Sequence, residues 1–284
     1  MTHQGRSRHA PAVSPIALAL ACHPGPTVAV TAITAVLAGA VGQPATGVAL
    51  VTGAVLAGQL SIGWGNDWLD RDRDRRTART DKPLVSGAVT ARTVLAAALI
   101  AAVACLVLSL ASGTPGLLHL AAVASGWSYN LGLKATAVSP VPFALSFGLL
   151  PAYVVAAAPG LGTAPAWMIT AGALLGTGAH FANVLPDLAD DVATGVRGLG
   201  HRIGHRWCVV AATAFLVAAV ATLAGGPPGP PTAAGWVAVA VATATGGTGF
   251  ALGRRRGSRS LFTAVLILAV VAVALLLASG TELR

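Results

Sequence analysis

Two acidic segments of this sequence have the residue types and spacing to bind a metal ion. Residues 66–74, NDWLDRDRD, and residues 183–191, NVLPDLADD, share the pattern Asn-x3-Asp-x3-Asp and hold seven of the nine acidic residues. Residues four apart share one face of an α-helix, and Asp67 lies close to the same stripe because it precedes Asp74 by two turns. Carboxylates without nearby His or Cys suit Mg²⁺. The candidate metal ligands are Asp67, Asp70, Asp74, Asp187 and Asp191.

A purely structural role for these aspartates is a poor explanation. Each segment follows an apolar run and so falls near the C-terminal end of a predicted helix, where negative charge opposes the helix dipole. Like charges four residues apart also repel. We expect Asp72, which points away from the stripe, to pair with arginines on the solvated side. Two such stripes beside a membrane therefore predict a cation that holds them together.

The rest of the chain is typical of a polytopic membrane protein. Of its 284 residues, 55% are hydrophobic and only 10% charged, whereas a soluble domain is about 25% charged. We predict an all-α protein with nine transmembrane helices of about 20 residues each. Residues 1–14 are expected to form a disordered cytoplasmic tail, and residues 15–284 a single membrane domain. The expected spans are 26–43, 46–66, 91–111, 115–132, 138–158, 164–185, 207–225, 233–252 and 260–279.

The basic residues predict how the chain is oriented in the bilayer. All of the 18 Lys and Arg residues except Arg284 fall in the N-terminal tail or in alternate connections between spans. The positive-inside rule then places the N terminus and the acidic loops in the cytoplasm and the C terminus outside, in the plasma membrane. This distribution also explains the net charge of +9 without a nucleic-acid partner. Two carboxylate stripes at the cytoplasmic end of a lipid-lined cavity predict a diphosphate with a hydrophobic tail, bound through metal ions.

Three segments together resemble the UbiA superfamily of intramembrane prenyltransferases. Residues 66–74 resemble its NDxxDxxxD motif, RTDKPLVSG at 79–87 its R-x-x-(R/K)-P-L-x-S-G loop, and DLADDVATGVRGLGHRIG at 187–204 its second acidic motif. The resemblance implies nine transmembrane helices around a central cavity with a polar cytoplasmic cap. It also implies Mg²⁺-dependent ionisation of an isoprenyl diphosphate and transfer of the prenyl group to a small acceptor.

Further polar residues are candidates for binding the substrates. Many members of this family carry a Tyr-x3-Lys pair after the fourth span, whereas here Tyr129 precedes Lys134 by five residues and Asn130 occupies the expected position. His23 and His180 are candidate acceptor contacts, although His180 could equally be a packing residue. The candidate diphosphate ligands are Asn66, Asn183, Lys82, Lys134, Arg79, Arg197, Arg202 and Tyr129.

Several functions are compatible with these motifs. The leading hypothesis is transfer of a prenyl group to an aromatic or quinone-type acceptor. A terpene cyclase, or prenyl transfer to a sugar phosphate or glycerol phosphate, would use the same metal motifs. The low aromatic content, 5%, favours a transferase, because aromatic faces stabilise a migrating cation in a cyclase. A transporter is disfavoured, because transporters place such charges near the bilayer midplane.

Overall fold

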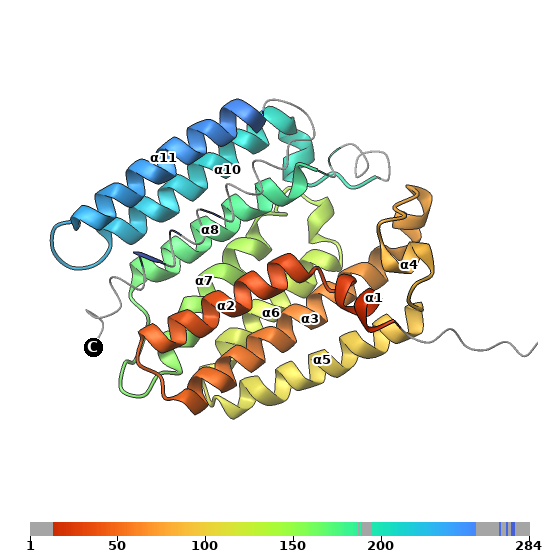
Figure 1. Ribbon diagram of the computed structural model, residues 1–284, viewed down its shortest axis with the longest axis horizontal. Coiled ribbons are helices and arrows are strands. Elements are labelled where there is room, and N and C mark those ends of the chain that lie inside the picture. Colours follow the sequence, from red (N-terminus) through yellow and green to blue (C-terminus); the bar gives the residue numbers. More distant parts are fainter. Residues whose placement is uncertain are drawn as a thin grey trace, which may run out of the picture.

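The computed structural model of the chain is a bundle of helices (Figure 1). It describes residues 14–186, 188, 195–253 and the single positions 267, 271, 274 and 275. In this part of the chain every regular element is helical. The elements are α1 (Pro15–Leu20), α2 (Pro24–Ala40), α3 (Ala45–Arg76), α4 (Pro83–Ser86), α5 (Ala91–Ala111), α6 (Gly116–Asn130), η1 (Leu133–Ala135), α7 (Val141–Ala156), α8 (Ala166–Val184), α10 (Leu199–Gly225) and α11 (Ala233–Gly253).

Each of the first eight expected spans corresponds to one of these helices. Within the described residues, α3, α5 and α10 are long and apolar enough to cross a membrane, and α2, α7 and residues 233–245 of α11 are shorter apolar helices. The ninth expected span and nearly all of the predicted N-terminal tail lie outside the described residues, so nine spans remain a prediction. The described residues include three short helices outside the expected spans, α1, α4 and η1.

Helix α3 continues well beyond the apolar segment expected at 46–66. Its polar end is held in helical form by pairs three residues apart, in which Arg73 contacts Asp70 and Arg75 contacts Asp72. The helix ends at Arg76: Ala78 adopts a left-handed conformation with φ 53°, and the Arg79 N–H donates to the Asp74 carbonyl at 3.0 Å. The acidic segment therefore belongs to the same rod as the span below it.

The helices pack so that the acidic end of α3 is surrounded by short elements. Helix α3 packs on α2, α5 and α6, while α8 packs on α7 and α10, and α11 on α10. In Figure 1 the ends of α3 and α1 and the short helix α4 gather at the right-hand end of the bundle. Trp64 fastens α1 to α3, because its Nε1 donates to the Leu18 carbonyl at 2.8 Å. These elements bring residues that are remote in sequence close to the aspartates.

Candidate active site

The acidic segment of α3 presents its aspartates on two faces. Asp67, Asp70 and Asp74 are buried, with 1%, 8% and 6% of their surfaces exposed. The Asp72 side chain is 65% exposed and pairs with Arg75 at 3.2 Å. The structure thus agrees with the predicted stripe and with the solvated position of Asp72. We refer to Asp67, Asp70 and Asp74 below as the carboxylate row.

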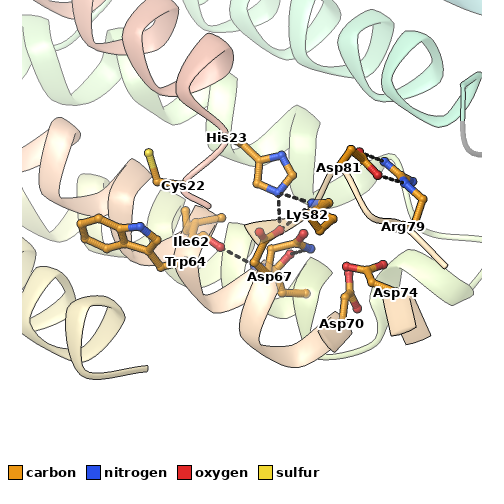
Figure 2. Close-up of polar contacts among 12 residues, drawn as sticks. Cys22, His23, Ile62, Trp64, Asp67, Asp70, Asp74, Arg79, Asp81 and Lys82 are labelled. Atoms are coloured by element: carbon orange, nitrogen blue, oxygen red, sulfur yellow. Dashed lines mark hydrogen bonds and ion pairs between the residues drawn. The ribbon is translucent and has the colours of Figure 1, made fainter. Parts of the chain in front are cut away.

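Asp67 is held by two basic side chains from other segments. Its Oδ1 accepts from Lys82 Nζ at 2.6 Å and lies 3.0 Å from His23 Nε2 (Figure 2). Lys82 Nζ is also 3.3 Å from the same ring nitrogen. The other carboxylate oxygen of Asp67, Oδ2, is buried and has no hydrogen-bond partner among the described residues. A buried carboxylate oxygen that is left unpaired is costly, so this atom is available for a cation.

The backbone at His23 is specialised to place this ring at the site. His23 is the residue before α2 and has left-handed dihedral angles, φ 56° and ψ 67°. The preceding turn is fixed because Thr27 Oγ1 donates to the Cys22 carbonyl at 3.0 Å. It also packs directly on α3 at Gly63, where any side chain would overlap the Cys22 carbonyl. A non-glycine residue held at positive φ is common at functional positions.

Asp70 is held by one lysine from a distant segment and one arginine of its own helix. Lys134, in η1, places Nζ 2.5 Å from Oδ1 and 2.7 Å from Oδ2. Arg73 Nη2 donates to Oδ2 at 2.9 Å, and Arg73 Nε lies 3.9 Å from Asp74 Oδ1. The sequence did not single out Arg73, although its position three residues after Asp70 is the spacing of a helical ion pair.

The two predicted asparagines differ in their surroundings. Asn66 Nδ2 donates to Asn130 Oδ1 at 3.0 Å, and Asn130 Nδ2 donates to the Ile62 carbonyl at 3.0 Å. Asn130 therefore ties α6 to α3 directly below the carboxylate row, a function that the sequence did not reveal. Asn183 is exposed. The other members of the second motif, Asp187 and Asp191, lie outside the described residues.

Within the described residues, the predicted arginines contact groups other than the carboxylate row. Arg79 Nε and Nη2 each lie 3.1 Å from a carboxylate oxygen of Asp81 (Figure 2). These bonds lower the pKa of Asp81 below its ordinary value. Arg197 and Arg202 are exposed, and Arg202 Nε donates to the Arg197 carbonyl at 3.0 Å. Of the basic candidates, Lys82 and Lys134 are thus the ones whose side chains contact the carboxylate row.

Tyr129 and His180 belong to an aromatic cluster formed by α6, α7 and α8. Tyr129 packs edge-on against Phe143 and His180, with ring centroids 5.1 and 5.8 Å apart. Phe147 and Phe181 extend the cluster on either side. His180 is fully buried, and its Nε2 is 3.2 Å from Ser139 Oγ. Its Nδ1 has no hydrogen-bond partner within the residues that the structure describes.

This cluster bears on the argument that the low aromatic content favours a transferase. Phe143 and Phe147 are one turn apart on α7, and Phe143 packs against His180 on α8. A chain with few aromatic residues can thus still gather several rings in one place. The aromatic content alone therefore does not separate a cyclase from a transferase.

The carboxylate row is chemically suited to a hard cation. It supplies oxygen ligands only and is bordered by two lysines that could contact an anion. One of its buried oxygens, Asp67 Oδ2, has no partner in the described part of the chain. Within the described residues no three His, Cys, Asp or Glu side chains are close enough together to hold a metal by themselves. A metal would thus need further ligands, such as phosphate oxygens or the second motif.

Comparison with known proteins identifies the family. The model of the UbiA prenyltransferase family matches residues 27–258, and the chain belongs to this family. No curated protein sequence matches the chain.

Solved structures of three similar proteins share the fold. An apo UbiA homologue from Aeropyrum pernix K1 has a TM-score of 0.72 at 20% identity, covering 90% of this chain and 98% of the other. A UbiA homologue from Archaeoglobus fulgidus bound to GPP and Mg²⁺ has a TM-score of 0.70 at 15% identity, covering 94% and 99%. A digeranylgeranylglyceryl phosphate synthase has a TM-score of 0.67 at 14% identity, covering 94% and 98%.

Proposed function

We propose that this member of the UbiA prenyltransferase family transfers a prenyl group from an isoprenyl diphosphate to an aromatic or quinone-type acceptor within the membrane. The observation that carries the proposal is the carboxylate row, buried at the end of an apolar helix and contacted by Lys82 and Lys134. Relatives of the same fold are bound to GPP and Mg²⁺ and to DMAPP and Mg²⁺, which supports the substrate class.

The carboxylate row would hold Mg²⁺, together with Asp187 and Asp191. Bound Mg²⁺ supplies positive charge next to the diphosphate as it leaves. Lys82 contacts Asp67 and Lys134 contacts Asp70, and their ammonium groups are close enough to the row to bind diphosphate oxygens as well. In the reaction the bond between the prenyl carbon and the diphosphate oxygen breaks, and its electron pair leaves with the diphosphate. The acceptor forms the new bond and loses a proton.

The aromatic cluster and His23 are the candidate contacts of the acceptor and the cation. The rings of Tyr129 and Phe143 come from α6 and α7, which also line the space below Asn130. Their faces could stabilise an allylic cation or stack on an aromatic acceptor. His23 does not belong to this cluster; it lies against Asp67 and Lys82. A prenyl transfer to glycerol phosphate is the second candidate, supported by the likeness to a digeranylgeranylglyceryl phosphate synthase.

Product analysis tests this function directly. The purified protein is incubated with Mg²⁺ and a panel of prenyl diphosphates, with and without phenolic acids, naphthoates and glycerol phosphate, and the products are identified by mass. We expect a prenylated product that forms only when an aromatic acceptor is present. A cyclic hydrocarbon or alcohol formed from the diphosphate alone would establish a cyclase instead.

We also propose that the carboxylate row faces the cytoplasm in the plasma membrane. The charge distribution supports this orientation. Single cysteines in place of Thr80, after the row, and Thr114, between α5 and α6, test it, because both positions are exposed and the native cysteines Cys22, Cys105 and Cys208 are buried. An impermeant thiol reagent should label Thr114→Cys in intact cells and Thr80→Cys only in inverted vesicles. The reverse pattern would overturn the orientation.

A further inference from the structure

A cavity of about 40 Å³ lies inside the bundle below the carboxylate row. Its walls come from α2, α3, α6 and α7, and α3 contributes Val55, Gln59 and Ile62. These three residues follow the helical spacing that leads upward to Asn66 and then to Asp70. The face of α3 that carries the carboxylates therefore continues downward as a wall of this cavity.

Two helices show how deep the cavity reaches. Asn66 and Asn130 hydrogen-bond to each other and so mark the same level on α3 and α6. Val55 precedes Asn66, and His119 precedes Asn130, by eleven residues each, which is about 16 Å along a helix axis. Both residues line the cavity, so they lie at its far end from the carboxylates.

His119 is fixed rigidly at this end. Ser109 Oγ donates to the Cys105 carbonyl at 2.6 Å, which uses its single hydrogen. The ring nitrogen Nδ1 of His119, 2.7 Å from Ser109 Oγ, must then be the donor in that contact. The other nitrogen, Nε2, is consequently an acceptor. The ring also stacks on Tyr153, with centroids 4.9 Å apart, and the Tyr153 hydroxyl is 2.8 Å from Ser112 Oγ.

The bundle is tightly packed below His119. Tyr153 is completely buried, and Val51 and Val154 of the same packed cluster are 1% and 0% exposed. Leu150 lines the cavity and precedes Tyr153 by three residues on α7, so it lies at the same end of the cavity as His119. A ligand that enters from the carboxylate end thus meets packed side chains at this end.

We propose that this cavity receives the tail of the prenyl diphosphate and that His119 and Leu150, at its packed end, limit the tail to a short chain. The inference rests on the proposed function, whose substrate it narrows. A space of about 40 Å³ is small compared with the cavity of about 150 Å³ that accepts benzene in an engineered protein, so a long tail has no preformed room. Hydrocarbon also cannot hydrogen-bond to Nε2, so a tail pressed against His119 leaves that acceptor unpaired.

The test compares kcat/KM for dimethylallyl, geranyl, farnesyl and geranylgeranyl diphosphates. The unaltered protein should prefer dimethylallyl or geranyl over geranylgeranyl diphosphate by at least about tenfold. His119→Ala and Leu150→Ala should each raise the ratio of geranylgeranyl to geranyl turnover by about tenfold or more, because they remove side-chain bulk from the packed end. His119→Phe keeps the bulk of the ring and should keep the length limit.

A matched control separates the effect of these two residues from general loss of packing. Leu216→Ala makes the same truncation as Leu150→Ala, but on α10 at a residue that is 2% exposed, belongs to a different packed cluster and does not line the cavity. It should therefore leave the ratio unchanged. If His119→Ala does not fold, Leu150→Ala decides the question, since it leaves the contact between Ser109 and His119 intact. An unchanged ratio in the truncated variants, or equal use of geranylgeranyl and geranyl diphosphate by the unaltered protein, overturns this inference alone. Failure of the unaltered protein to bind or convert any prenyl diphosphate overturns the proposed function and this inference with it.

Discussion

Four aspartates lie at the end of α3, and although they carry the same carboxylate group on the same helix, their partners differ. The three of the carboxylate row are buried, and two of them contact lysines that follow them by 15 and 64 residues. Asp72 is exposed, and its partners Arg71 and Arg75 belong to its own helix. The buried aspartates thus depend on how the bundle folds, whereas Asp72 depends on local sequence alone.

The difference has an energetic side. Exposed ion pairs contribute at most about 1 kcal/mol, because water already solvates both charges. Buried carboxylates lose that solvation, and removing one partner leaves an uncompensated charge. A row of buried carboxylates is therefore a poor device for stability, and we infer that it is retained for binding.

The largest expected effect comes from changing one member of the carboxylate row. Asp70→Asn keeps the shape of the side chain but removes the charge, and should lower prenyl transfer at saturating Mg²⁺ by at least about a hundredfold. Asp72→Asn is the matched control and should stay within about twofold, because surface substitutions away from a site have small effects. Turnover of both variants, with their folding checked by thermal unfolding, is the measurement. Comparable losses in the two variants would contradict the distinction drawn between the two faces.

A smaller effect is expected when a partner of the row is changed. Lys134→Gln leaves Asp70 with Arg73 as its described ion-pair partner and should lower the free energy of unfolding by about 1–3 kcal/mol. Adding Asp70→Asn should recover part of this loss, because it removes the buried charge that Lys134 had helped to neutralise. The coupling energy of the double-mutant cycle should reach about 1 kcal/mol. Additive losses would mean that the two side chains do not stabilise each other.

The smallest effect is expected at the exposed pair between Asp81 and Arg79. Since Arg79 lowers the pKa of Asp81, the ionised form contributes stability above the ordinary carboxyl pKa of about 4, and this contribution is lost as the pH falls through the lower native pKa. Asp81 is 62% exposed, so Asp81→Asn should cost less than about 1 kcal/mol at pH 7. The difference in melting temperature between the unaltered protein and Asp81→Asn should therefore shrink as the pH is lowered. A difference in melting temperature that grows at low pH would contradict a lowered pKa of Asp81.

The lengths of the apolar segments were enough to predict the first eight helices, and helical periodicity was enough to predict the face of the carboxylate row. It correctly placed Asp72 among arginines, because that side of α3 depends only on neighbours within one turn. It did not predict that Asn130 would pair with Asn66, because that contact depends on how closely α6 approaches α3. Arg73 was also missed, although its spacing from Asp70 is that of a helical ion pair. The roles of Tyr129 and His180 remain predictions, since the structure gives their packing and not their ligands.

The unbroken length of α3 makes the thickness of the surrounding bilayer relevant to the enzyme. Its 32 residues extend about 48 Å, whereas the hydrocarbon core of a membrane is about 30 Å thick. The same rigid rod therefore fixes the height of the carboxylate row relative to the lipid headgroups. In lipids with longer acyl chains, the headgroup layer would move toward the row or the helix would tilt. We therefore expect turnover in reconstituted vesicles to vary with acyl-chain length even when substrate and Mg²⁺ are saturating.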